Sequence, residues 1–198
     1  MTPWTVRSAV PDDLDGIIET FLQCWRVNYA AVLGPLLASR MDDARARALW
    51  EPLLGESGPG TGGNEAALVA VRSADGPVSD EVGFPTVGGI TRFELVDEST
   101  TEVHSLYVSP RVQAGGLGRL LLSAACDSAR GRGATQARLW VFRENLPSLS
   151  FYCAQGWLFD GTERVQPEFG EPELRLTKML GPTKALSEPG GHGVRKSP

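Results

Sequence analysis

A glycine-rich turn is the feature of this sequence with the clearest chemical potential. Residues 101–108 are typical of a strand, and Gly115, Gly116 and Gly118 then precede an amphipathic helix. Backbone N–H groups in such a turn point inward together, and the positive end of the helix dipole adds to them. A side chain at Gly116 or Gly118 would hold an anion away from these amides. The spacing therefore predicts a phosphate-binding turn that needs no basic side chain.

Two nucleotide-binding motifs compete for the same glycines. A Walker-type loop requires a lysine followed by Ser or Thr, and no lysine follows here. A dinucleotide fingerprint requires a third glycine where Leu121 stands, and the next strand, 137–142, carries no acid for a ribose, although Glu144 lies just beyond it. On the motif alone, the remaining alternative is a tight turn that binds nothing.

Glu102 and His104, on the strand before the turn, are candidates for moving a proton. Alternation along a strand places both on one face with Leu106 and Val108, about 7 Å apart along the chain. Either side chain is suited to take a proton from an alkylammonium, of which only about 0.1% is free base at neutral pH. The alternative is structural: Glu102 pairs with a surface cation, and His104 is a hydrogen-bonded imidazole of the core.

Composition narrows the class of protein. The chain has 198 residues, 41% of them hydrophobic and 22% charged, as expected for one globular domain. A formal net charge of -5 without a basic stripe argues against a nucleic-acid partner. No apolar run approaches the roughly 20 residues that span a bilayer, and no signal peptide is evident, so we expect a cytoplasmic protein without a membrane partner. The spacing of the three cysteines and two histidines indicates reduced thiols and no metal site.

Hydrophobic periodicity predicts a mixed α/β (α+β) domain. Helices are expected at about 11–25, 35–54, 117–131 and 147–155. Strands are expected at 4–8, 66–72, 87–95, 101–108, 137–142, 157–160 and 172–180. The strand–helix–strand unit over 101–142 implies one parallel strand pair in a mostly antiparallel central sheet, flanked by about four helices. Residues 55–64 and 73–86 are expected as loops, 1–180 as a single domain, and 181–198 as a disordered tail.

Two separated segments together resemble the GNAT superfamily of N-acetyltransferases. QAGGLG at 113–118, after LYVSP, fits that family's Q/R-x-x-G-x-G/A motif, and NLPSLSFYCAQGW at 145–157 is similar to its N-x-x-A-x-x-F-Y-x-x-x-G-F segment. The first and last strands are also similar, so the resemblance covers about residues 4–180. The sequence departs from the pattern at Gln113, where arginine is commoner, and at Trp157, where phenylalanine is usual. Positions 149 and 150, often basic in relatives, are Leu and Ser.

The resemblance implies a GNAT-like fold that uses acetyl-CoA and releases CoA. The backbone of Val108 stands where relatives bond the pantetheine arm, and residues 113–119 stand at the pyrophosphate. Asn145 contacts the pantetheine arm or positions its helix, unless it only caps that helix. The residues expected to bind the cofactor are Leu106, Tyr107, Val108, Gln113, Ala114, Gly115, Gly116, Leu117, Gly118, Arg119 and Asn145.

The resemblance also implies direct attack by a primary amine in a ternary complex, without a covalent enzyme intermediate. Glu102 stands where some relatives carry a catalytic glutamate, so it is the slightly favoured base over His104, with water relaying the proton. Tyr152 occupies the family's tyrosine position and is the expected acid for the departing thiolate. Its alternative role is packing on the inner face of its helix.

The acceptor stays open between a small amine, a peptide N-terminus and a lysine side chain. By resemblance it binds between the first two helices and the loop joining the last two strands, here about 160–171. That loop carries Asp160, Glu163, Glu168 and Glu171, and the helices bring Trp25, Tyr29 and Trp50. A non-catalytic acyl-CoA-binding regulatory module and a Rossmann-type nucleotide-binding protein are the rival functions. A homodimer, frequent among the family's members, is a further possibility.

Overall fold

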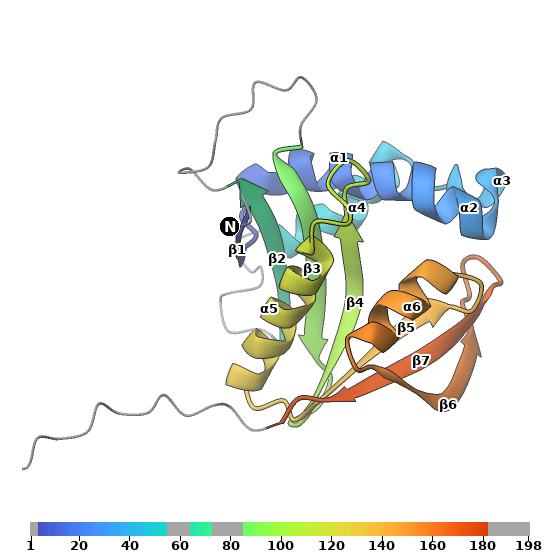
Figure 1. Ribbon diagram of the computed structural model, residues 1–198. Helices are drawn as coiled ribbons and strands as arrows, with labels where there is room; N and C mark the ends of the chain where they lie inside the picture. The colour runs from blue at the N-terminus through green and yellow to red at the C-terminus, as the bar shows by residue number, and fades with distance from the viewer. Residues whose placement is uncertain (1–3, 55–63, 73–84, 182–198) are drawn as a thin grey trace, which may run out of the picture.

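A seven-stranded sheet with helices on both faces forms the centre of the molecule (Figure 1). The computed structural model describes residues 4–54, 64–72 and 85–181. Residues 55–63, 73–84 and 182–198, which hold most of the two expected loops and the expected tail, lie outside the described residues. The strands follow the order β1-β2-β3-β4-β5-β7-β6. Their bounds are β1 Trp4–Ser8, β2 Glu65–Arg72, β3 Val87–Leu95, β4 Thr100–Val108, β5 Gln136–Phe142, β6 Leu158–Val165 and β7 Pro172–Met179.

The helices agree with the expected ranges except in two places, since the first helical segment continues past residue 25 to Leu33 and the second is divided. They are η1 Pro11–Asp13, α1 Leu14–Cys24, η2 Trp25–Tyr29, α2 Ala30–Leu33, α3 Pro35–Ala38, α4 Asp43–Leu54, α5 Leu117–Gly131 and α6 Leu146–Ala154. The continuous helix expected over 35–54 is wrong, because α3 and α4 are separate. The Asp42 carboxylate accepts the backbone N–H of Arg45 at 2.9 Å, which starts α4 as a new helix.

Two apolar layers hold the helices to the sheet. Ile17, Phe21 and Trp50 of α1 and α4 pack with Ile90 on one face, and all are almost fully buried. On the other face, α5 and α6 pack on a cluster that includes Leu139. No helix within the described ranges is both long enough and apolar enough to cross a bilayer.

The strands β4 and β5 are the one parallel pair among the described strands, and they separate halfway along their length. Their pairing covers only Thr100–Val103 and Gln136–Leu139. Beyond Val103, β4 continues against β3, whereas β5 continues against β7. Figure 1 shows the two strands diverging toward the end of the sheet where α6 lies. The divergence leaves a gap in the middle of the sheet.

A β-bulge at His104 changes which side chains share a face of β4. Arg92 of β3 lies opposite Ser105, but Phe93 lies opposite Val103, so His104 is the extra residue. Val103 and Leu106 consequently pack in the same core cluster. The expectation that Glu102 shares a face with Leu106 and Val108 is therefore wrong, because it assumed unbroken alternation.

Candidate functional site

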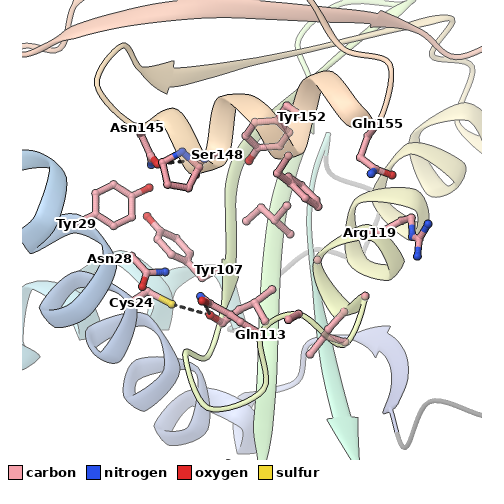
Figure 2. Close-up of a pocket in the computed structure, with 18 residues that line it drawn as sticks. Cys24, Asn28, Tyr29, Tyr107, Gln113, Arg119, Asn145, Ser148, Tyr152 and Gln155 are labelled. Carbon is pink, nitrogen blue, oxygen red and sulfur yellow. Dashed lines mark hydrogen bonds between the residues drawn. The ribbon is translucent and has the colours of Figure 1, made fainter.

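One cavity of about 560 Å³, which we call the turn cavity, lies in the gap between β4 and α6 (Figure 2). The end of β4, the glycine turn and the first turn of α5 form one side of it. Helix α6 and the end of the first helical segment form the other. All the residues expected to bind a cofactor line this cavity except Gly115. The lining residues are Cys24, Asn28, Tyr29, Leu106, Tyr107, Val108, Gln113, Ala114, Gly116, Leu117, Gly118, Arg119, Asn145, Pro147, Ser148, Phe151, Tyr152 and Gln155.

The turn holds its shape through backbone angles that most residues avoid. Gly116 has φ +80° and Ala114 has φ 66°, both in the left-handed region. Ala114 is the one non-glycine residue with positive φ in the described part of the chain. Such strain of roughly 1–2 kcal/mol is found where a surrounding site requires it, and alternating left-handed residues form anion-binding concavities.

The side chain of Gln113 does not extend along the turn to its amides. Its Nε2 donates to the carbonyl oxygen of Val108 at 2.9 Å, which ties the turn back onto the end of β4. Gln113, which was expected at the pyrophosphate, thus also stabilises the turn through its side chain. The backbone N–H groups of the turn are then the groups available to bind an anion.

The start of α5 favours an external anion. Gly116 is its N-cap and, within the described residues, no side chain caps the helix. The first turn carries no acid, and Arg119 places a cation at the end where an acid would stabilise the helix. A β-carbon at Gly118 would lie 3.4 Å from the ring of Phe151, which is an ordinary van der Waals contact. Unpaired helical N–H groups and a nearby guanidinium are the elements of a phosphate site.

The free edge of β4 offers hydrogen-bonding groups to the gap. The N–H of Ser109 donates to the carbonyl of Gly88 at 2.9 Å, so by antiparallel alternation the backbone groups of Leu106 and Val108 point away from β3. The carbonyl of Val108 also accepts the Cys24 thiol at 3.2 Å. Burial raises the pKa of Cys24 to about 12, which keeps this thiol a protonated donor. An extended ligand with amide groups matches such an edge.

Asn145 caps α6. Its Oδ1 accepts the backbone N–H of Ser148 at 3.2 Å, and the residue is buried. The capping alternative is therefore confirmed for its oxygen, while contact of Asn145 with a cofactor stays a prediction.

A second cavity of about 250 Å³, which we call the aromatic cavity, adjoins the first. It lies among α1, η2, the separated halves of β4 and β5, and the connection between β6 and β7. The two cavities meet in the gap, because they share the lining residues Tyr29, Leu106, Tyr107, Asn145, Ser148 and Tyr152. The π-helical turn η2 aims Tyr29 at this junction, and such turns occur often at functional sites.

The three tyrosines of the chain converge at the junction. Figure 2 shows the hydroxyl groups of Tyr29 and Tyr107 turned toward one another, with Tyr152 on the facing helix. Burial raises the pKa of all three phenols above the ordinary value, so each is protonated at neutral pH. The sequence singled out only Tyr152 for its hydroxyl. Tyr29 was noted as one of several aromatic residues, and its position at the junction was missed.

The two candidate bases occupy different environments. Glu102 is buried, its Oε2 accepts from Arg138 Nε at 2.5 Å, and it is not among the described residues that line either cavity. His104 lines the aromatic cavity, with Nε2 3.2 Å from Glu94 and Nδ1 3.5 Å from Glu102. The structure therefore brings His104, rather than Glu102, to a cavity wall.

The acids expected in the last loop are largely paired. Strand β6 runs to Val165, so the loop expected over 160–171 is shorter, and Asp160 and Glu163 are strand residues. Asp160 pairs with Arg175, Glu163 with Arg143, and Glu168 with Arg45. Only Glu168 of the expected acids is among the residues lining the aromatic cavity.

Sequence reasoning missed Glu173. This residue of β7 is buried, lines the aromatic cavity and pairs with Arg164 at 2.7 Å. Alternation in PELRLTKM did contain the signal, since Glu173 falls on the face opposite Leu174 and Leu176.

Comparison with known proteins agrees with this architecture. A model of the acetyltransferase (GNAT) family matches residues 77–157. The chain is 19% identical to the PaiA N-acetyltransferase of Thermoplasma acidophilum, solved with coenzyme A, with a TM-score of 0.64 over 90% of this chain and 99% of that one. It is 23% identical to yncA of Salmonella typhimurium, solved with its cofactor acetyl-CoA, with a TM-score of 0.61 over 93% and 98%. These likenesses define the fold as the one these acetyltransferase structures share.

Curated proteins give shorter matches. The chain is 23% identical over 159 residues to an uncharacterized N-acetyltransferase of Methanocaldococcus jannaschii, covering 78% of this chain and 60% of that protein. It is 38% identical over 60 residues to the mycothiol acetyltransferase of Streptomyces bingchenggensis, covering 30% of this chain and 20% of that protein. The chain thus spans less than two thirds of each of these relatives. The family model, the curated relatives and the shared fold all make this chain similar to GNAT acetyltransferases.

Proposed function

We propose that this protein transfers an acetyl group from acetyl-CoA to a primary amine by direct attack in a ternary complex. The observation that carries the proposal is the junction of the two cavities. The glycine-rich turn opens into a gap between β4 and β5, and the gap leads to a second cavity lined by a histidine and buried tyrosines. Two reactants entering from opposite sides would meet there.

The turn cavity suits acetyl-CoA. The amides of 114–119 and the start of α5 would hold the pyrophosphate, with Arg119 beside it. The backbone groups of Leu106 and the N–H of Val108 would bond the amides of the pantetheine arm, since the Val108 carbonyl already accepts from Cys24 and Gln113. When bound, the cofactor supplies an activated acetyl thioester. PaiA and yncA, which share this fold, were solved with coenzyme A and acetyl-CoA respectively.

Proton transfer is assigned to Tyr152 at the junction and to His104 in the wall of the aromatic cavity. Burial keeps the Tyr152 phenol protonated, so its hydroxyl can donate a hydrogen bond to the departing thiolate and pass its proton as that thiolate loses its own solvation in the junction. On the acceptor side, His104 takes the proton of the incoming ammonium through water. Glu94 and Glu102 flank the imidazole and hold its orientation. We prefer His104 to Glu102 as the base, because Glu102 is already engaged with Arg138.

Two measurements test the proposal in sequence. Calorimetric titration with acetyl-CoA should show saturable binding, and thiol release should then be followed against a panel of primary amines. Binding with no release against any amine would contradict catalysis and favour the acyl-CoA-binding module. Stabilisation by NAD rather than by CoA would favour the Rossmann-type alternative.

A further inference from the structure

Aromatic rings form a continuous wall of the aromatic cavity. Ring centroids lie 5.2 Å apart for Trp25 and Phe169, 6.1 Å for Phe169 and Phe142, and 6.0 Å for Phe142 and Tyr29. Tyr29 in turn stacks on Trp25 at 4.7 Å. The faces of such rings attract a cation and also accommodate apolar groups. This wall matches a ligand that carries an ammonium next to an apolar body.

Glu173 supplies the negative charge on the same side. It lies opposite Phe142 in the β5–β7 register and is only 7% exposed. Its charge also reaches the tyrosine junction, because it adds to the effect of burial in raising the pKa of Tyr29. Arg164 bonds Oε2 of this carboxylate, so among the described contacts Oε1 is the atom placed to accept a ligand ammonium.

Arg164 is the nearest cation of the cavity, and it is occupied. Its Nε bonds Glu173 at 2.7 Å, and its guanidinium lies 4.1 Å from the centroid of the Trp140 ring. A carboxylate on the ligand would have to compete with Glu173 for this guanidinium and would lie beside a buried negative charge. Like charges placed together in this way disfavour a ligand.

The cavity is also small. Its volume of about 250 Å³ equals the liquid volume of about eight water molecules at ~30 Å³ each. A compact ligand fits inside it whole, whereas a polypeptide would fill it only with a side chain.

We propose that the aromatic cavity takes a small arylalkyl or similarly apolar primary monoamine without an α-carboxylate, and that Glu173 holds its ammonium. The proposal rests on the proposed acetyl transfer, because that function makes this cavity the acceptor side. It assigns Glu173 and the wall of Trp25, Phe142 and Phe169 to acceptor specificity.

Equilibrium binding to the CoA-loaded protein tests the proposal without requiring turnover. Phenethylamine and phenylalanine form a matched pair that differs only in the α-carboxylate, and a short lysine peptide represents a protein acceptor. Titration calorimetry should give a Kd for phenethylamine at least about 10-fold below those of phenylalanine and the peptide. Equal affinities, or no binding of phenethylamine, would overturn the proposal.

Variants then assign the effect to Glu173. Glu173→Gln should raise the Kd of phenethylamine about 10-fold or more and narrow its advantage over phenylalanine, because Arg164 is released while the CoA affinity is unchanged. The control is Glu163→Gln, which removes an exposed carboxylate paired with Arg143 outside the cavity and should change none of these values. A Glu173→Gln protein that binds CoA and retains the preference would also overturn the assignment. Failure of the proposed acetyl transfer is seen separately, as absent thiol release while phenethylamine still binds.

Discussion

The turn cavity and the aromatic cavity share their junction residues but are built from different parts of the chain. The turn cavity depends mainly on backbone: one nearly continuous stretch, 106–119, provides the edge of β4, the left-handed turn and the start of α5. The aromatic cavity depends on side chains from segments far apart in the sequence, including η2, β5, β7 and the β6–β7 connection. A site made from amides should tolerate most side-chain changes except at its glycines. In a site made from side chains, the substitution of any one lining residue should change which ligand is bound.

The difference explains how one fold can keep a cofactor while its acceptors vary. The amides of the turn are fixed by a few φ angles, and those angles depend on local residue types. The acceptor wall can be altered one residue at a time without disturbing the turn. Substitutions at the junction, in the turn and in the surrounding sheet should therefore have separable effects.

The largest effect is expected at the junction itself. Tyr152→Phe removes the proposed proton donor and should lower kcat roughly 10²- to 10⁴-fold. The affinities for CoA and for the amine should stay within about twofold, since the ring and its packing remain. Steady-state kinetics and calorimetry measure both. Tyr107→Phe is the matched control, and an equally large fall in kcat for that variant would contradict a specific role of the Tyr152 hydroxyl.

A charge placed in the turn should act on the cofactor alone. Gly118→Asp puts a carboxylate beside the uncapped start of α5, where it would repel a pyrophosphate and raise the Kd for CoA about 100-fold, or about 3 kcal/mol. The new β-carbon meets Phe151 at ordinary contact distance, so the fold should persist. Ser123→Asp, on an exposed position of the same helix, should leave the Kd unchanged. Equal weakening by both variants would show that only overall charge matters.

Glu102 separates structural from chemical roles. Glu102→Gln leaves Arg138 without its buried carboxylate and should lower the free energy of unfolding by about 1–3 kcal/mol, with kcat within about threefold of the parent. His104→Gln should do the reverse, with a small change in stability and a fall in kcat of about 100-fold. Urea denaturation and steady-state kinetics report the two quantities. If Glu102→Gln loses more kcat than His104→Gln while its stability is unchanged, Glu102 rather than His104 is the base.

The smallest effect concerns the strain in the turn. Ala114→Gly relieves a positive φ at the cost of a more flexible unfolded chain, so the free energy of unfolding should stay equal or rise by up to about 1 kcal/mol. The CoA affinity should be retained. Ala124→Gly, inside α5, is the matched control and should cost about 1 kcal/mol. Thermal unfolding distinguishes them, and a loss of stability at position 114 as large as that at 124 would argue against strain.

Local patterns predicted most of the architecture. Apolar periodicity located the strands and most of the helices, and the glycine spacing at 115–118 located the turn, because both depend on neighbouring residues. The break between α3 and α4 was missed, because the Asp42 cap interrupts an apolar repeat that looks continuous.

Features that depend on contacts between distant segments were not predictable in the same way. The bulge at His104 exists only in the register between β3 and β4, and it moved Glu102 away from the face expected for it. The ion pair of Glu102 with Arg138 joins two strands across the parallel pair. Glu173 of β7 lines its cavity together with residues of η2 and of the β6–β7 connection, which are distant in sequence. The two cavities also differ in this respect: the side of the turn cavity formed by residues 106–119 could be predicted from contiguous sequence, and the aromatic cavity could not.

The separation of β4 from β5 has a consequence for solubility. An open sheet ordinarily presents unpaired backbone only at its two outer strands, where it invites pairing with another chain. Here the end of β4, from His104 to Val108, is a third strand edge inside the sheet, because its pairing with β5 ends at Val103 and Leu139. The Cys24 thiol and the Gln113 amide already occupy the carbonyl of Val108, as protective donors at that edge. A bound pantetheine arm would pair with further backbone groups of this strand edge. Bound CoA should therefore reduce self-association of the protein as well as serve as a reactant.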